Sequence, residues 1–375
     1  MAATAPTTNR HIPALDGVRG IAIILVVVFH AWRTEVSALG WTGVDLFFVL
    51  SGFLITGVLA DSRERADRVP RFFVRRALRI LPLYYGVLIA VFVLRPLLHV
   101  TPRRDDVLLA GEQAWYWTYL CAWRLGVGHP RAYTFLTHFW SLSIEEQFYF
   151  VWPWVVWFVS RRRVIATAAV LCVIAPLARA YFVLGTPFHD AAYMLPPCRM
   201  DALAVGAILA LAIRGPGGAG ATASWVRPAA LAGGATLALL ALLAPSLEYT
   251  DPLMSTIGFT AIDWMAAGLI MLAITRPSGL LASAPLRAAG RYSYGLYVIH
   301  PFVNWWAIRH APVLERNEFA YVAGVLAIST GLAVISYHLY ESPFLRLKDR
   351  IAWISATWVD SFAHLFPRGE LDRHA

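Results

Sequence analysis

Residues 14–33 read ALDGVRGIAIILVVVFHAWR, and this stretch decides the class of protein. A helix of about 20 predominantly apolar residues is long enough to cross the hydrocarbon core of a bilayer. Asp16, Arg19 and His30 stand inside this stretch. Ionisable residues within a spanning helix are expensive to bury and are therefore candidates for function. The stretch predicts a membrane-spanning helix that carries chemistry.

The rest of the chain continues the apolar pattern. Of its 375 residues, 58% are hydrophobic and only 15% are charged, and the mean hydropathy is +0.58. Because soluble domains carry roughly 25% charged residues, the composition excludes a soluble enzyme, a disordered chain and a nucleic-acid-binding module. We predict an all-α integral membrane protein, a bundle of about ten transmembrane helices. The predicted spans are 14–33, 41–60, 80–98, 139–160, 164–184, 199–213, 228–245, 254–274, 292–310 and 319–340.

The distribution of positive charge orients this bundle. When ten spans are counted from a cytoplasmic N-terminus, most of the 32 Lys and Arg residues fall in segments on the cytoplasmic side. The positive-inside rule therefore predicts that both termini are cytoplasmic. Counting the apolar stretch 107–123 as an eleventh span would move the arginines at 161–163 outside, so we expect this stretch to be external or re-entrant.

We divide the chain into a transmembrane domain, residues 1–345, and a cytoplasmic tail, residues 346–375. Apolar residues recur in the tail at helical spacing, which predicts an amphipathic helix that lies on the membrane. These residues are Ile351, Ile354, Trp358, Phe362 and Leu365.

The first span carries a candidate base. Arg19 and His30 are eleven residues apart, which is almost three helical turns, so both project from one face, about 16 Å apart along the axis. His30 can act as a general base, or it can be an interior histidine that bonds a neighbouring helix. Arg19 can contact a ligand, or it can extend its charged end to the inner interface.

Two carboxylates are candidates for orienting His30. Asp45 lies near the start of the second span, at a depth similar to His30, so its carboxylate could fix the imidazole tautomer; the alternative is a helix cap. Glu145 and Glu146 begin the fourth span. Ser143 and Glu146 have the spacing of a capping box, which explains Glu146 structurally and makes Glu145 the better candidate.

Arg75, Arg76 and Arg79 form a dense basic cluster next to the third span. Guanidinium groups suit phosphates, so the cluster predicts a site for a phosphate-bearing ligand; lipid headgroups are the alternative. The three cysteines lack metal-ligand spacing, so we expect no metal site. Four further residues could form either interhelical polar pairs or part of a site: Arg199, Asp201, His300 and Glu341.

Together these segments resemble the integral-membrane acyltransferase family 3. The resemblance is carried, in the family's order, by residues 15–20, 29–31, 43–53, 75–82, 140–149, 199–203, 293–301 and 340–343. It implies a bacterial cell-membrane enzyme that takes acyl groups, usually acetyl, from acyl-CoA and delivers them to hydroxyl groups. The family's arginine-to-histidine motif corresponds to Arg19 and His30, and its Arg-x-x-Arg motif corresponds to Arg76 and Arg79.

The resemblance leaves the acceptor open. A carbohydrate or glycan is the leading expectation, and a lipid or a small natural product such as a macrolide is the alternative. Some relatives carry an extra extracytoplasmic domain; we expect this chain to have none, so we expect either direct transfer or a separate extracytoplasmic partner. An acyl-histidine intermediate is an alternative to direct transfer. The rival functions are a multi-pass transporter and a non-catalytic sensor of lipid or CoA.

Overall fold

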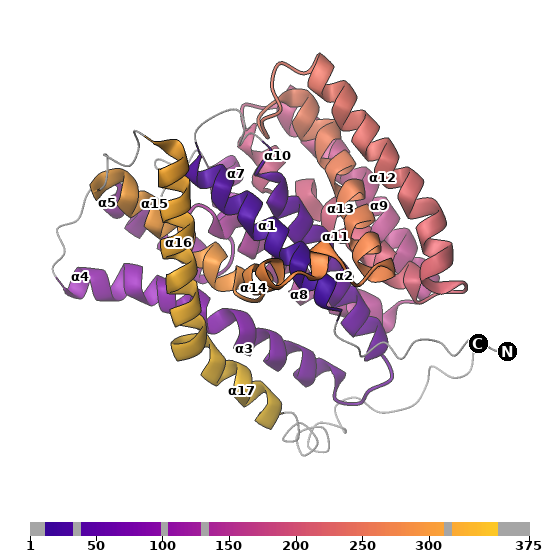
Figure 1. Cartoon of the computed structure of the whole chain (residues 1–375), viewed down its shortest axis with the longest axis horizontal. Coiled ribbons are helices and arrows are strands. Elements are labelled where there is room, and N and C mark those ends of the chain that lie inside the picture. Colours follow the sequence, from indigo (N-terminus) through magenta and orange to yellow (C-terminus); the bar gives the residue numbers. More distant parts are fainter. Residues whose placement is uncertain (1–11, 33–38, 99–103, 129–134, 311–316, 352–375) are drawn as a thin grey trace.

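Long helices dominate the architecture (Figure 1). The computed structural model describes residues 12–32, 39–98, 104–128, 135–310 and 317–351, and its regular structure in these ranges is entirely helical. The long helices are α1 (Pro13–Ala31), α2 (Thr42–Asp61), α3 (Arg68–Ile89), α8 (Phe139–Phe158), α9 (Arg161–Gly185), α11 (Pro196–Ile213), α12 (Gly218–Leu243), α13 (Phe259–Thr275), α15 (Ser293–His310) and α16 (Glu318–Ser336).

Shorter pieces extend or connect these helices. Single π-helical turns join α3 to α4 (Arg95–Leu97), precede α13 and follow α16; they are Ala90–Leu94, Met254–Gly258 and Tyr337–Glu341. The remaining short helices are α5 (Arg104–Gly111), α6 (Gln113–Trp117), α7 (Cys121–Val127), α10 (Asp190–Met194), α14 (Ala284–Arg291) and α17 (Ser342–Ile351), and a 3-10 turn spans Leu280–Ala282.

The long helices overlap the ten predicted spans, although α3 and α12 begin ten or more residues before the spans predicted at 80–98 and 228–245. In the described residues, eight helical segments are long and apolar enough to cross a membrane, among them Arg68–Leu97, which joins α3 to α4. The other two predicted spans are occupied by α8 and α15, of 20 and 18 residues, whose Trp, Tyr and polar residues lower their mean hydropathy. The prediction of an all-α, multi-pass membrane protein is confirmed.

The ambiguous stretch 107–123 does not form a spanning helix. It is divided among α5, α6 and α7, the longest of which has 8 residues. Arg124 on α7 pairs with Glu112, the residue between α5 and α6, with Nη2 2.7 Å from Oε1. Most of the predicted tail helix, from residue 352 onward, lies outside the described residues.

Helices α2 and α11 form the centre of the bundle. In α2, 72% of the spanning window is buried within the protein, whereas in α12 the fraction is 17%. The two central helices approach at backbone distance, because a Cβ on Gly52 would lie 2.0 Å from the Leu203 carbonyl oxygen, and one on Gly206 would lie 2.0 Å from that of Val49. Small residues permit such close packing in membranes, where apolar side chains gain little from leaving lipid.

Candidate active site

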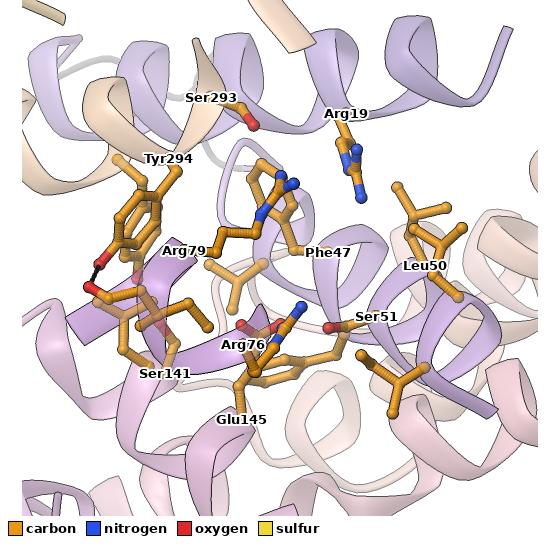
Figure 2. Close-up of a pocket in the computed structure, with 17 residues that line it drawn as sticks. Arg19, Phe47, Leu50, Ser51, Arg76, Arg79, Ser141, Glu145, Ser293 and Tyr294 are labelled. Atoms are coloured by element: carbon orange, nitrogen blue, oxygen red, sulfur yellow. Dashed lines mark hydrogen bonds between the residues drawn. The ribbon is translucent and has the colours of Figure 1, made fainter. Parts of the chain in front are cut away.

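One pocket opens between α1, α2, α3, α8 and α15 (Figure 2). It contains about 810 Å³ of space free of protein atoms, counted out to its mouth. On α2 its lining extends from Val44 to Ile55, and this separation corresponds to about 16 Å of helix. Much of the wall is apolar, including Phe47, Phe48 and Leu142. The space therefore suits an elongated ligand with an apolar stem.

Three arginines give the pocket its charge. Arg19, Arg76 and Arg79 line it, and Figure 2 shows their guanidinium groups pointing into a common space from α1 and α3. Arg76 and Arg79 lie on one face because they are three residues apart on α3. Glu145 is the carboxylate in the lining, so three positive charges face one negative charge. An excess of guanidinium groups around an open space favours an anionic ligand such as a phosphate.

Arg76 is held in place by aromatic and acidic neighbours. Its Cζ lies 3.7 Å from the centroid of the Tyr149 ring, a cation–π geometry. Glu145 lies beside Arg76, Ser51 and Tyr149, and the Ser51 and Tyr149 hydroxyl groups are hydrogen-bonded to each other. Glu145 thus contacts the arginine side of the pocket and not His30, which the sequence analysis proposed that it orients.

Of the other residues predicted to belong to a site, some lie beside the pocket without lining it, and Arg19 also has a partner on its own helix. Arg75 is not among the lining residues, although it belongs to the same turn of α3. Glu341 lies in the π-helical turn after α16, accepts a hydrogen bond from Ser336 (3.0 Å) and lies near Arg79. Arg19 is 3.3 Å from Asp16 on its own helix.

His30 lies near the opposite end of α1 from Arg19. Its Nδ1 is 2.8 Å from the Val26 carbonyl oxygen, which can only accept, so Nδ1 carries the proton and Nε2 of the neutral ring has a free lone pair. The residue is exposed at the surface of the bundle. An accessible imidazole with a fixed tautomer has the arrangement that a general base requires. The predicted carboxylate partner is replaced here by a backbone carbonyl.

Two buried histidines lie behind His30. The His300 ring centroid is 5.0 Å from that of His30 and 5.8 Å from that of His138. His300 is fully buried and His138 is 5% exposed. We call these three residues the histidine cluster. In the described part of the chain, no group of three or more His, Cys, Asp or Glu residues is arranged to hold a metal ion.

Tyr297 connects the pocket to the histidine cluster. It lines the pocket, and its ring centroid lies 5.4 Å from that of His138 and 5.9 Å from that of His300. Its hydroxyl donates to the His138 carbonyl oxygen (2.8 Å) and is hydrogen-bonded to Ser141, another lining residue. The two sites therefore share a wall, and Tyr297 and Ser141 form part of that wall.

Asp45 does not contact His30, which corrects the sequence-based hypothesis of a carboxylate on the imidazole. Arg199 Nη2 lies 2.6 Å from Asp45 Oδ1, and both residues are almost completely buried. The Arg199 guanidinium also stacks over Phe259, with Cζ 4.4 Å from the ring centroid. This ion pair forms because α2 and α11 pack closely. The two helices are not consecutive in the chain, so hydropathy alone could not predict that they are neighbours.

Asp201 is also paired within the bundle. Arg179 Nη1 lies 3.0 Å from Asp201 Oδ1 and Nη2 lies 2.8 Å from Oδ2, and Thr260 donates to Oδ2 at 2.8 Å. Asp263 is fully buried, and neither of its carboxylate oxygens has a hydrogen-bond partner among the described residues. We call Asp45, Arg179, Arg199, Asp201 and Asp263 the buried charge network.

The sequence analysis did not single out four of these residues. Arg179 and Asp263 stand within predicted spans, so an ionisable residue inside an apolar segment was the available signal. His138 immediately precedes the fourth predicted span, next to the segment 140–149 that carries the family resemblance. Tyr297 lies in the segment 293–301. Its role depends on contacts with α8, and such contacts between distant helices cannot be read from the local sequence.

Comparisons with known proteins show the family of this chain. The family model described as an acyltransferase domain matches residues 12–338. The chain is 29% identical over 357 residues to "O-acetyltransferase OatA" of Staphylococcus aureus, covering 89% of this chain and 57% of that protein. It is 29% identical over 364 residues to "Putative peptidoglycan O-acetyltransferase YrhL" of Bacillus subtilis, covering 89% and 55%.

A shorter similarity covers 41% of the chain and 25% of "Peptidoglycan O-acetyltransferase OatA" of Listeria monocytogenes, with 32% identity over 165 residues. The chain thus spans just over half the length of the curated relatives that it matches over most of its own length. No solved structure gives a significant match. With its apolar helices and a family match from residue 12 to residue 338, the chain belongs to the integral-membrane acyltransferase family 3 and is a multi-pass membrane protein.

Proposed function

We propose that this protein is an O-acyltransferase of the bacterial cell membrane that moves an acetyl group from acetyl-CoA to a hydroxyl group of a glycan. Family membership and the O-acetyltransferase activity named for the relatives support acetyl transfer, and the names of two of them point to peptidoglycan as the acceptor. The observation that carries the proposal is a helix, α1, with a pocket arginine toward one end and an exposed histidine toward the other.

The pocket lined by Arg19, Arg76 and Arg79, which we call the arginine pocket, is the site for the acyl donor in this proposal. Arg19, Arg76 and Arg79 bind the phosphates of the donor, since guanidinium groups are suited to phosphate oxygens. The pantetheine arm follows the apolar wall along α2 toward Ser141 and Tyr297. A cytoplasmic entrance at the arginine end agrees with the topology expected from the positive-inside rule.

His30 is the base in this proposal. As the acceptor oxygen attacks the thioester carbonyl, Nε2 of His30 takes the hydroxyl proton. The carbon–sulfur bond then breaks, and the departing CoA thiolate takes that proton from Nε2, which restores the neutral ring. The hydrogen bond from Nδ1 to Val26 keeps the correct nitrogen free in each cycle.

The distance between the two ends constrains this mechanism. A Cβ on Gly43 would lie 2.4 Å from the Ala22 carbonyl oxygen, so the pocket's outer end at Val44 is level with the middle of α1. His30 is eight residues beyond Ala22, or about 12 Å along the helix. The thioester therefore passes the wall formed by Tyr297 and Ser141 to reach His30, or the acceptor hydroxyl extends inward to meet it.

The test uses the purified chain in lipid nanodiscs with acetyl-CoA and soluble peptidoglycan fragments. Release of the CoA thiol and acetylation of the fragments, read by mass spectrometry, are measured together. We expect CoA release to depend on the acceptor and His30→Ala to lower transfer by about 10²–10⁴-fold, the usual contribution of a general base. His310→Ala is the matched control, because His310 lies on α15 and is exposed.

The outcomes separate the proposal from its rivals. Acetylated fragments that require His30 support it. If no CoA thiol is released with any acceptor, the protein is not this enzyme, and a transporter or sensor becomes the better interpretation. If acetyl phosphate supports acetylation of the fragments at the same rate as acetyl-CoA, the arginines recognise a phosphate group alone, and acetyl-CoA is not the specific donor. If His30→Ala transfers normally, the base has been assigned to the wrong residue.

A further inference from the structure

His300 holds a nitrogen that the proposed mechanism does not use. Its Nδ1 lies 2.9 Å from the Leu296 carbonyl oxygen, so Nδ1 donates and Nε2 of the neutral ring keeps its lone pair. The residue is completely buried, and no described residue donates to Nε2. A buried acceptor without a donor costs about 1–3 kcal/mol, so its presence calls for a physical reason.

The ring of His300 lies against that of His30. Because Nδ1 bonds back to its own helix, the Nε2 edge is on the side of the ring away from α15. The rings of His30 and His300 meet edge to face, with centroids 5.0 Å apart and planes 69° apart. His30 is therefore exposed on one side and backed by an electron-rich imidazole on the other.

Asn304 continues the same contact one turn further along α15. Its Nδ2 donates to the His30 carbonyl oxygen at 2.9 Å, and its Oδ1 accepts from the Tyr321 hydroxyl at 2.7 Å. His300 and Asn304 are four residues apart and share a helix face. One face of α15 thus contacts both the side chain and the backbone of His30.

The proposed reaction creates a positive charge at His30 for which the structure provides no carboxylate partner in the described residues. Asp45, from α2, is paired with Arg199, and Glu318, from α16, accepts from Trp32 Nε1 at 2.9 Å. Asp263 on α13 belongs to the buried charge network, and Asp16 on α1 pairs with Arg19 on its own helix. The rings that adjoin the His30 imidazole are those of Phe29, its neighbour in the chain, and the neutral His300.

We propose that His300 is a positioning residue that orients His30 and stabilises its protonated form through the Nε2 lone pair. This inference rests on the proposed function, in which His30 is the base. As the hydroxyl proton moves to His30 Nε2, the ring becomes an imidazolium. The negative end of the His300 ring dipole attracts that cation, and the attraction ends when the thiolate takes the proton. His300 itself neither gains nor loses a proton.

Two substitutions separate the ring from its nitrogen. His300→Phe keeps an aromatic ring but removes the lone pair, whereas His300→Gln loses the ring but keeps an acceptor oxygen at a similar reach. His310→Phe is the matched control, because His310 is on the same helix and its Nδ1 also bonds the carbonyl four residues earlier, that of Trp306, at 3.0 Å. All variants are measured in nanodiscs for kcat, for KM of both substrates and for thermal unfolding.

We expect His300→Phe to lower kcat by about tenfold, the effect of one lost hydrogen-bond-strength interaction in the transition state, with both KM values unchanged. We expect His300→Gln to recover most of that loss and His310→Phe to match the wild type. If His300→Phe retains kcat while His300→Gln loses it, ring packing alone matters and the inference is wrong. If His300→Phe unfolds at a lower temperature than the wild type, the kcat of His300→Gln decides between the two explanations: a kcat near that of the wild type supports the inference, and a reduced kcat contradicts it.

The closing arm combines His300→Phe with His30→Ala. If His300 acts through His30, the double variant is as slow as His30→Ala alone; a further loss means that His300 acts independently, which contradicts the inference. If the wild type transfers acetyl, His30→Ala is inactive and His300→Phe has the wild-type kcat, then this inference is wrong and the proposed function stands. An active His30→Ala overturns the proposed function instead.

Discussion

The buried charge network and the arginine pocket both hold arginines inside an apolar bundle, yet they are built differently. In the network, Arg179 and Arg199 each have an aspartate within 3.0 Å and almost no exposed surface. In the pocket, Arg79 is exposed to the cavity and three guanidinium groups share one lining carboxylate. Buried charge with a fixed partner holds helices together, whereas surplus charge around open space is available to a ligand.

This difference explains why the same residue type has two expected roles. Removing one partner of a buried ion pair leaves an uncompensated charge, which costs far more than the pair itself contributes. A guanidinium that faces a cavity keeps access to water, so its removal has a small effect on folding. Substitutions in the two regions should therefore separate stability from donor binding.

The largest effect is expected for Arg179→Ala. It leaves Asp201 buried without its bidentate partner, and the loss of one member of a buried pair costs about 3–5 kcal/mol. The variant should unfold at a markedly lower temperature and be recovered in low yield from the membrane, as read by thermal unfolding in detergent. Unfolding at the wild-type temperature would mean that the network does not stabilise the bundle.

A functional effect without a structural one is expected for Arg79→Ala. Loss of one charged hydrogen bond of about 1.5–3 kcal/mol should raise KM for acetyl-CoA by about 10–100-fold, with the unfolding temperature near that of the wild type. Arg71→Ala is the control on the same helix, because Arg71 pairs with Asp67 outside the pocket. Equal KM values for the two variants would remove Arg79 from the donor site.

An intermediate effect is expected at the shared wall. Tyr297→Phe removes the hydrogen bond to the His138 carbonyl oxygen and the contact with Ser141, a loss of about 1 kcal/mol. We expect kcat to fall several-fold while KM for the donor stays constant, because the arginines are untouched. A change in donor KM with unchanged kcat would instead assign Tyr297 to donor binding.

The smallest effect is expected for Asp263→Asn. Neither carboxylate oxygen of Asp263 has a hydrogen-bond partner to lose among the described residues, so the amide of the same shape should change stability by less than about 1 kcal/mol. Asp201→Asn is the comparison, since it removes the charge opposite Arg179. If both substitutions lower the unfolding temperature equally, Asp263 stabilises the network as Asp201 does.

Local sequence features predicted the parts of the site that lie on single helices. Arg76 and Arg79 fall on one face of α3 by their spacing, and the distance from Arg19 to His30 follows from helical geometry. Glu145 lines the pocket and Glu146 does not, so the preference for Glu145 stays a prediction. The capping box that explained Glu146 is wrong, because α8 begins at Phe139 and Ser143 lies inside it. The prediction that Asp45 contacts His30 was wrong, because Asp45 forms an ion pair with Arg199, 154 residues further along the chain.

The sequence by itself determined that this is an all-α membrane bundle, where its spans lie and to which family it belongs, because hydropathy over about 20 residues and short ordered motifs are local properties. Only the tertiary structure decided that Asp45 pairs with Arg199, that His138 and His300 back His30, and that Tyr297 joins the two sites. These contacts depend on which faces of distant helices meet. Helices that are apolar on nearly every side carry too little pattern to specify that choice.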